Sequence, residues 1–350
     1  MTERIPLLID CDTGIDDSLA LLYAVASPEA EILAVTCCTG NVEAEQVAAN
    51  TLAVLELAGR TDIEVALGRK VPLVRPVEVT PETHGPQGLG YATLPASTRQ
   101  LSERHAADII IEAARARPGD VTLVTLGPMT NLAVALDREP QLPRLLKRLV
   151  FMGGAFRVPG NTTPTTEWNI HCDPEAARRV FAAFGAAPRH PLGVGLDVTE
   201  KAAVLPEHVV ALARRAGSQP DDSIALTDHE DPLVATRSVA SNPIVRYIAD
   251  ALRWYMEFHA RYDGFYGAYI HDPLAMAAAL DPGLIRTEAV HVDVDTAGGL
   301  ADGQTIADWR RLTGKAANVD VAVSADGDEF LRRFIDRVGG LAERRSDVAL

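Results

Sequence analysis

Four aspartates stand within eight residues near the beginning of the chain, in the segment Asp10-Cys11-Asp12-Thr13-Gly14-Ile15-Asp16-Asp17. An apolar run, Ile5–Ile9, precedes them and a helical pattern, Ser18–Ala26, follows, so they fall at the carboxyl end of an expected strand. Carboxylates this close repel one another and raise one another's pKa values unless a cation or a proton compensates. Oxygen ligands without paired Cys or His favour Ca²⁺ or Mg²⁺ over zinc. The cluster therefore predicts a metal site or a site of proton transfer.

Part of this cluster has a simpler explanation. Acidic residues are common in the first turn of a helix, where free N–H groups and the helix dipole stabilise negative charge, and this would account for Asp16 and Asp17 alone. It does not account for Asp10 and Asp12, whose side chains we expect to project beyond the end of the strand. We therefore interpret the cluster as functional.

The composition limits the class of protein. With 350 residues, 47% of them apolar, the chain can bury a large core. Its net charge of -15 argues against nucleic acid or an anionic membrane as a partner and favours a small polar or neutral ligand. The four cysteines are too few for a disulfide framework, and no leader or membrane-spanning stretch is evident. We expect a soluble, cytoplasmic protein.

Short apolar runs alternate with helical patterns along most of the chain. This alternation predicts an α/β fold, with an open, mostly parallel sheet flanked by helices, in a single domain covering residues 1–350. In such sheets ligands bind at the carboxyl ends of the strands, where the aspartates fall. The expected strands are Ile5–Ile9, Ile32–Thr36, Val121–Leu126, Leu149–Met152 and Val194–Leu196, and the helical stretches include Ala44–Leu57 and Ala106–Ala116.

Other segments predict the surroundings of this core. A stretch rich in Pro, Thr and Gly, Val71–Gln100, indicates a long loop over the same edge of the sheet. The segment Ala216–Asp231 is polar and acidic, which favours an excursion between helices. The last elements are expected to be a long amphipathic helix, two strands and a closing helix: Pro243–Tyr262, Val290–Asp295, Asn318–Ser324 and Glu329–Val338.

A later motif, His271-Asp272-Pro273, offers a further carboxylate and a proton carrier. Histidine changes its charge near neutral pH, so His271 beside a metal carboxylate is a natural acid or base. Asp272 could equally be the N-cap of the apolar helix Leu274–Leu280.

Several polar residues have both a functional and an ordinary interpretation. In Glu167-Trp168-Asn169, strand-like alternation would turn Glu167 and Asn169 toward one ligand, although a polar loop around one buried Trp fits as well. The remaining candidates lie next to glycines and could be turn or surface residues: Asn41, His84 and Asn161.

Taken together, these segments resemble the nucleoside hydrolases, the inosine-uridine-preferring N-ribohydrolase family. The resemblance follows the family's order over nearly the whole chain, and the early aspartate cluster combined with the late His-Asp-Pro is specific. The other matching segments are Gly40-Asn41, Leu126-Gly127-Pro128-Met129-Thr130-Asn131, Glu167-Trp168-Asn169, Asp173-Pro174-Glu175-Ala176, Leu196-Asp197-Val198-Thr199, His271-Asp272-Pro273-Leu274-Ala275 and Asn318-Val319-Asp320.

The resemblance implies a Ca²⁺ ion deep in a pocket at the edge of the sheet. Asp12 would also take a proton from a Ca²⁺-bound water. Carried over by position, the metal ligands would be Asp12, Asp17, Asp272 and the main-chain carbonyl of Leu126.

The resemblance also implies how a ribonucleoside would be held. Asp16 and Asn169 would bind ribose hydroxyls, and His84 and His271 would lie on the side of the base. Water would displace the base directly, with inversion at C1′, through a ribosyl cation-like transition state, and His271 would protonate the departing base. The remaining residues of the sugar pocket would be Asn41, Asn161 and Glu167.

The resemblance also bears on the preferred base and on the oligomeric state. The purine-specific branch of the family places Trp where this chain has His271, which favours the non-specific or pyrimidine-preferring branches. The family commonly forms homodimers or homotetramers. The preferred base would depend on residues near His259, Tyr262, Tyr266 and Tyr269.

Two other functions remain possible at this stage. Asp10-x-Asp12 after a strand also suggests a Mg²⁺-dependent aspartate-nucleophile phosphatase, although Gly14 stands where that class has Thr or Val. A non-catalytic Ca²⁺-dependent nucleoside- or ribose-binding protein could share the fold and the metal site. Such a binder would not need Asp12 and His271 together with all the metal carboxylates, so an enzyme is favoured.

Overall fold

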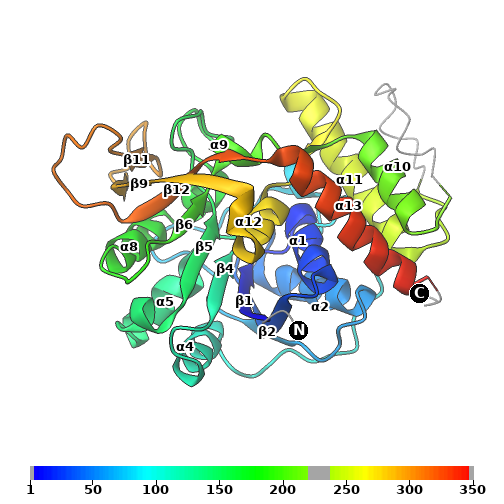
Figure 1. The fold of residues 1–350 in the computed structure, drawn as a ribbon, viewed down its shortest axis with the longest axis horizontal. Helices are drawn as coiled ribbons and strands as arrows, with labels where there is room; N and C mark the ends of the chain where they lie inside the picture. Colours follow the sequence, from blue (N-terminus) through cyan, green and yellow to red (C-terminus); the bar gives the residue numbers. More distant parts are fainter. Residues whose placement is uncertain (1–3, 220–236, 347–350) are drawn as a thin grey trace.

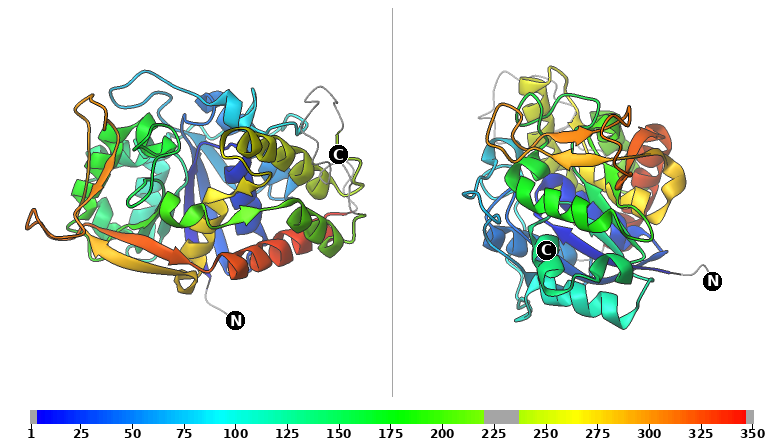
Figure 2. Two further views of the ribbon diagram at one scale, coloured as in Figure 1. Left: turned by 90° about the horizontal axis from the view of Figure 1, so that it is seen from above. Right: turned by 90° about the vertical axis from the view of Figure 1, so that its left-hand side faces the viewer.

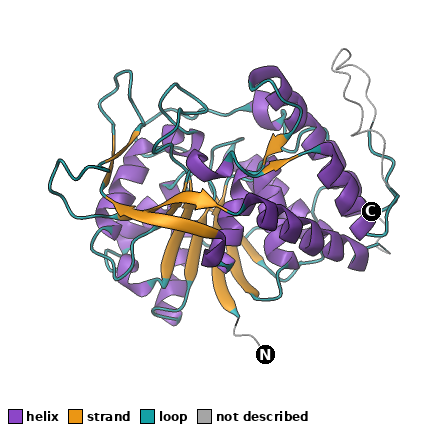
Figure 3. Cartoon of the chain, turned by 45° about the horizontal axis from the view of Figure 1, so that its top comes forward, coloured by secondary structure: helices purple, strands orange, loops and turns teal. Residues whose placement is uncertain are grey.

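The computed structural model describes residues 4–219 and 237–346, and its centre is a sheet of eight strands. The strands stand in the order β3-β2-β1-β4-β5-β6-β12-β9, and all neighbours are parallel except β12 and β9. This confirms the predicted open, mostly parallel sheet flanked by helices (Figure 3). The strands are β1 (Ile5–Cys11), β2 (Ala30–Cys37), β3 (Glu64–Leu67), β4 (Thr122–Thr125), β5 (Arg148–Met152), β6 (Leu192–Val194), β9 (Ile285–Val290) and β12 (Val319–Ala325).

Both faces of this sheet are buried. In β1, Leu7 and Ile9 pack into one hydrophobic core and Leu8 into the other, because successive side chains of a strand point to opposite faces. A strand covered on both sides needs apolar residues at every position, which explains the uninterrupted run from Ile5 to Ile9. Helices cover both faces (Figure 1). The first core receives α1 (Ile15–Ala26), α2 (Ala44–Leu57), α11 (Pro243–Tyr262), α12 (His271–Leu280) and α13 (Gly327–Arg344), and the second receives α4 (Ala106–Ala116), α5 (Thr130–Arg138) and α8 (Pro174–Phe184).

Shorter elements connect the main helices and strands. The helix α3 (Pro81–His84) lies within the predicted loop and packs against α11 (Figure 2). The remaining elements are α6 (Leu142–Leu145), α7 (Trp168–Cys172), α9 (Leu196–Thr199), α10 (Pro206–Arg215), a 3₁₀ turn (Pro282–Leu284), and two antiparallel pairs, β7 (Ala203–Val204) with β8 (Ala268–Tyr269) and β10 (Val292–Val294) with β11 (Thr305–Ala307).

Some predicted boundaries were wrong. The run Val194–Leu196 was expected to be a strand, but Leu196 begins α9 after Gly195 serves as its N-cap. The run Val290–Asp295 was expected to be one strand, but it spans the end of β9 and the start of the separate pair β10 and β11. The polar segment predicted from Ala216 to Asp231 lies outside the described residues from position 220 onward.

The loop of residues 71–100 is held against the body of the protein. The guanidinium of Arg75 contacts the carboxylates of both Glu175, in α8, and Asp302. The backbone N–H of Leu73 donates to Asp173 at 2.9 Å. These contacts fix the beginning of a segment whose later part reaches the candidate site.

In the described part of the chain, no helix is long and apolar enough to cross a membrane.

Asn131, at the start of α5, links the ends of three strands, β1, β2 and β3. Its substitution tests how much these contacts contribute to stability. Its amide donates to Asp10 at 2.8 Å and to the carbonyl of Cys37 at 3.0 Å, and its oxygen accepts from the N–H of Arg69 at 2.9 Å. Asn131→Ala should lower the free energy of unfolding by about 3 kcal/mol, because it leaves buried polar groups without partners. Urea denaturation, with the exposed Gln100→Ala as control, measures this. A loss below about 1 kcal/mol would contradict the assignment.

Candidate active site

The first aspartate of the cluster has a structural role. Asp10 lies inside β1, and its carboxylate accepts hydrogen bonds from the Thr36 hydroxyl at 2.5 Å and the Asn131 amide at 2.8 Å. The expectation that Asp10 projects beyond the strand is therefore wrong. Burial raises its pKa to about 6, although these two hydrogen bonds oppose the shift. Asp10 ties β1 to β2 and α5 below the site.

Asp12 directly follows β1 and is completely buried. Its Oδ2 accepts the backbone N–H of Asn41 at 2.8 Å, whereas its Oδ1 has no hydrogen-bond partner in the described structure. Two glycines leave the room that this carboxylate needs. A Cβ at Gly40 would lie 2.0 Å from Oδ2, and a Cβ at Gly127 would lie 2.5 Å from Oδ1. The chain thus brings three backbone segments against one carboxylate that keeps an oxygen free.

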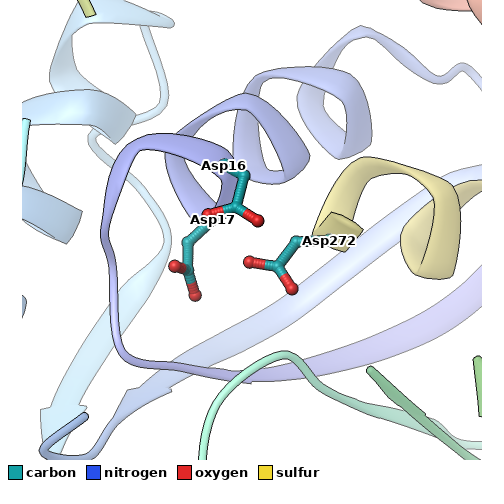
Figure 4. A group of neighbouring side chains, drawn as sticks. All are labelled: Asp16, Asp17 and Asp272. Carbon is teal, nitrogen blue, oxygen red and sulfur yellow. The ribbon is translucent and has the colours of Figure 1, made fainter. Parts of the chain in front are cut away.

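Three further carboxylates converge above Asp12. Asp16 and Asp17 project from the first turn of α1, and Asp272 projects from the first turn of α12 (Figure 4). One oxygen from each lies within 4.8 Å of the other two, and all three side chains are buried. Asp272 is not an N-cap, because Ile270 occupies that position of α12. The simple capping explanation of this residue is therefore wrong.

Asp17 is the most firmly held member of this triad. Its carboxylate accepts from the backbone N–H groups of Asp12 at 3.2 Å and Gly14 at 2.9 Å, and from the Asn41 amide at 3.0 Å. Its pKa is nevertheless raised, because burial outweighs these hydrogen bonds. The donors fix its orientation toward the neighbouring carboxylates.

The electrostatics of the group show an uncompensated concentration of negative charge. Burial, followed by the charge of Asp17, raises the pKa of Asp16 to about 8. The same two causes raise the pKa of Asp12 well above its ordinary range, and burial with the charges of Asp16 and Asp17 does so for Asp272. With the free oxygen of Asp12, these oxygen ligands fit a hard divalent cation.

The sugar-side candidates also meet at this place. Asn169 donates its amide to the carbonyl of Leu126 at 2.6 Å and to that of Met152 at 3.3 Å. Glu167 accepts from the backbone N–H groups of Gly154, Asn169 and Ile170 at 2.9, 2.8 and 3.1 Å. The strand-like alternation predicted here was wrong. Glu167 is instead the N-cap of α7, and this turn of helix brings Asn169 over the carbonyl of Leu126.

These residues border a cavity of about 460 Å³ at the carboxyl edge of the sheet. It brings together most of the residues predicted from the sequence. Asp12 and Asp17 lie outside its lining, and Asp12 connects to it through Asn41. The predicted residues that line it are Asp16, Asn41, His84, Leu126, Asn161, Glu167, Asn169, His271 and Asp272.

Two histidines also line the cavity. The Nδ1 of His84 accepts the N–H of Ile15 at 3.1 Å, and the Nδ1 of His271 lies 2.8 Å from the Thr199 hydroxyl. Burial lowers the pKa of each to about 3, and the charge of His259 contributes, so both rings are neutral near pH 7. His84 is buried, so its interpretation as a solvated loop residue was wrong.

Several residues that line the cavity were not predicted from the sequence. Tyr255 and Phe258 come from α11, Asp263 caps its end, and Glu200 caps α9. The predicted base-side residues His259, Tyr262 and Tyr269 line the cavity, whereas Tyr266 does not. The amphipathic pattern of α11 marked the helix, but nothing in it indicated which apolar residues face a ligand. The remaining missed lining residues are Thr80, Glu82, Thr83, Met152, Gly160, Thr162 and Trp168.

Comparison with known proteins identifies the class of enzyme. The family model of the inosine-uridine preferring nucleoside hydrolases matches residues 7–332. The chain belongs to this family. The pyrimidine-specific ribonucleoside hydrolase RihA of Escherichia coli O1:K1 is 35% identical over 335 residues, which cover 95% of this chain and 98% of that protein. The match decides for a hydrolase over the phosphatase and the non-catalytic binder.

Solved structures of the same family share the whole fold. A purine-preferring ribonucleoside hydrolase from Gardnerella vaginalis has a TM-score of 0.84 and 33% identity, covering 97% of this chain and 99% of that one. The plant nucleoside hydrolase PpNRh1 has a TM-score of 0.82 and 30% identity, covering 96% and 99%. Relatives with purine and pyrimidine preference are thus similarly close to this nucleoside hydrolase.

The buried carboxylates predict how stability depends on pH. The pKa of Asp16 rises from 3.8 to about 8 in the folded chain, so folding favours its neutral form. Its contribution to stability is present below pH 3.8 and is lost as the pH rises through about 8. Without divalent cations, the melting temperature should therefore fall over this range, and Ca²⁺ should remove most of the fall. Thermal melts in chelator and in Ca²⁺ test this, with Asp16→Asn expected to flatten the chelator curve. Equal pH dependence under both conditions would contradict the prediction.

Proposed function

We propose that this chain catalyses the Ca²⁺-dependent hydrolysis of the N-glycosidic bond of ribonucleosides to ribose and free base. The observation that carries the proposal is the buried triad Asp16, Asp17 and Asp272, of which Asp16 and Asp272 line a cavity that two neutral histidines also line. Membership of the nucleoside hydrolase family supports the reaction. The triad supports a cation, and the absence of Cys among its donors supports Ca²⁺.

The proposed metal ligands are Asp12, Asp17, Asp272 and the main-chain carbonyl of Leu126. The unpartnered Oδ1 of Asp12 and the raised pKa values of the carboxylates support this set. The carbonyl of Leu126 is engaged by Asn169, so that amide would have to turn toward the substrate. When bound, Ca²⁺ would neutralise these carboxylates, lower the pKa of a water and orient the ribose hydroxyls.

The residues around this position would bind the sugar and activate water. Asp12 takes a proton from the attacking water, which adds to C1′ on the face opposite the base and inverts that carbon. Asp16 and Asn169 hold ribose hydroxyls, and carboxylates on this side stabilise the positive charge that develops on the ribosyl group. The sugar pocket is completed by Asn41, Asn161 and Glu167, all of which line the cavity.

His271 is the proposed proton donor to the departing base. Its contact with Thr199 occupies Nδ1 and leaves Nε2 for the cavity, where His84 lies on the same side. Because burial keeps the ring neutral, it passes on a proton that it receives from a neighbouring group or water during the reaction. Its role is therefore greatest for bases that leave poorly without a proton.

Assembly into a homodimer or homotetramer is part of the same proposal. The loop that reaches the cavity exposes apolar side chains, with Val74 at 74% exposure, and Leu300 on the neighbouring loop is fully exposed. Arg75 joins these two loops through Asp302. A contact between copies of the chain would bury these side chains.

The first test of the proposal is ribose release from a panel of inosine, adenosine, guanosine, uridine and cytidine. Release should stop in chelator and return when Ca²⁺ is restored. Deoxyuridine should be at least roughly tenfold slower than uridine, because it lacks the 2′ hydroxyl that the site would bind. Release that persists after removal of all divalent metal would overturn the metal-dependent proposal.

The role of His271 can be separated from a structural one by the leaving group. His271→Ala should lower kcat for uridine by roughly a hundredfold or more, because uracil needs a proton to leave. The same variant should hydrolyse 4-nitrophenyl riboside nearly as fast as the unmodified enzyme, since nitrophenolate leaves without one. Steady-state kinetics with both substrates measure this. Equal losses for both would show that His271 does not protonate the base.

A further inference from the structure

The base side of the cavity is a continuous wall of aromatic rings. The ring centroids of His84 and Tyr255 lie 5.5 Å apart, those of Tyr255 and His259 4.7 Å, and those of His259 and Tyr269 5.0 Å. Tyr269 and His271 continue the series at 6.1 Å. All five line the cavity. The faces of tyrosine rings attract organic cations, and two of these five rings are tyrosines.

This wall also carries three carboxylates, and His259 is the one described lining residue whose charge opposes theirs. Glu82, Glu200 and Asp263 line the cavity, and its described lining includes no Lys or Arg. The carboxylate of Asp263 lies 2.6 Å from Nδ1 of His259, yet 44% of its side chain is exposed. Burial, followed by the charges of Glu200 and Asp263, raises the pKa of Tyr269, so both carboxylates lie near the aromatic wall.

Glu200 shows the lack of a compensating group. Glu200 is exposed to solvent as a residue, and partial burial of its carboxylate, followed by the charges of Asp263 and Asp197, raises its pKa to about 7. No hydrogen bond or ion pair of its side chain is formed with the described residues. A cation in the cavity would relieve this repulsion, whereas a neutral base would not.

The same wall also has polar atoms that could form hydrogen bonds with a ligand. Tyr255 is 3% exposed, lines the cavity, and its hydroxyl has no hydrogen-bond partner in the described part of the chain. His84 accepts a hydrogen bond at Nδ1, so its proton is on Nε2, which is likewise without a partner among the described residues. These groups can bind a carbonyl or an amide on a base that the carboxylates attract.

We propose that this cavity takes ribosides whose base carries a positive charge, the pyridinium ribosides and N-alkylated purine ribosides, as well as neutral ribonucleosides. The inference rests on the proposed ribonucleoside hydrolysis and names a substrate class for the same site. The aromatic wall and the carboxylates of Glu200 and Asp263 recognise the charge, and the metal-side carboxylates hold the ribose.

The reaction balances without a proton donor for the base. Water adds through oxygen to C1′, the C1′–N bond breaks, and its electron pair stays on nitrogen and cancels the positive charge. The products are ribose, a neutral base and one proton, which Asp12 takes from the water and passes to solvent. A cationic base thus leaves without protonation, which suits a wall rich in carboxylates.

Binding of two matched probes tests the inference independently of turnover. The cation 1-methylnicotinamide and neutral nicotinamide share a ring and a carboxamide, and neither has a glycosidic bond. Calorimetry on the Ca²⁺-loaded enzyme should show the cation bound roughly tenfold tighter. Glu200→Gln and Asp263→Asn should each reduce this preference severalfold, whereas the exposed Glu103→Gln, which changes net charge equally, should preserve it. Equal binding of the two probes by the unmodified enzyme would overturn the inference.

A kinetic arm distinguishes failure of this inference from failure of the proposed function. We expect the ratio of kcat/KM for nicotinamide riboside to that for uridine to fall roughly tenfold in Glu200→Gln. Comparing this ratio between variants removes the greater intrinsic lability of the pyridinium bond. An unchanged ratio, with uridine hydrolysed, would overturn the substrate class alone. No hydrolysis of any riboside would overturn the function, while the calorimetric preference would still report on cation binding by the acidic, aromatic wall.

Discussion

The constraint on which this structure depends is mutual repulsion among buried carboxylates. Asp12, Asp16, Asp17 and Asp272 come from two distant parts of the sequence, and burial and mutual repulsion make ionisation costly for them as a group. The apolar packing of α1 against α12 holds the two parts together in spite of this. Burying these carboxylates together lowers the stability of the fold unless a cation compensates their charge. The rest of the site surrounds the place where such a cation fits.

Close approach of backbone makes that arrangement possible. Gly40 and Gly127 stand against the two oxygens of Asp12, and any side chain at either position would displace the carboxylate. The same edge of the sheet supplies the N–H of Asn41 and the carbonyl of Leu126, which follow β2 and β4, the two strands that flank β1. Parallel topology therefore does more than bury apolar residues. It brings main-chain donors and acceptors from separate βα units to one carboxylate.

The parts that could be predicted from the sequence are those with local signals. The sheet, α2, α4 and α11 follow from periodicity, and the aspartate cluster and His271-Asp272-Pro273 stand out by residue type. Asp10 was misplaced because strand β1 continues two residues past its apolar run. Glu167 was read as part of a strand because an N-cap followed by one turn of helix leaves too short a pattern to recognise. Glu200 and Asp263 had no signal at all, because their closeness depends on how α9 and α11 pack.

The two halves of the cavity therefore differ in how well the sequence predicts their residues. The metal side is built from strand ends and helix starts, whose geometry the topology of the sheet imposes, so relatives with purine and pyrimidine preference share one fold. Glu200 ends α9 and His271 begins α12, but much of the base side is built from α3, α11 and the turn between α11 and β8, none of which belongs to the central sheet. Their side chains can change without disturbing the carboxylates. Selectivity for the base can therefore change separately from the carboxylate group, and the acidic, aromatic wall of this chain lies mostly on elements outside the central sheet.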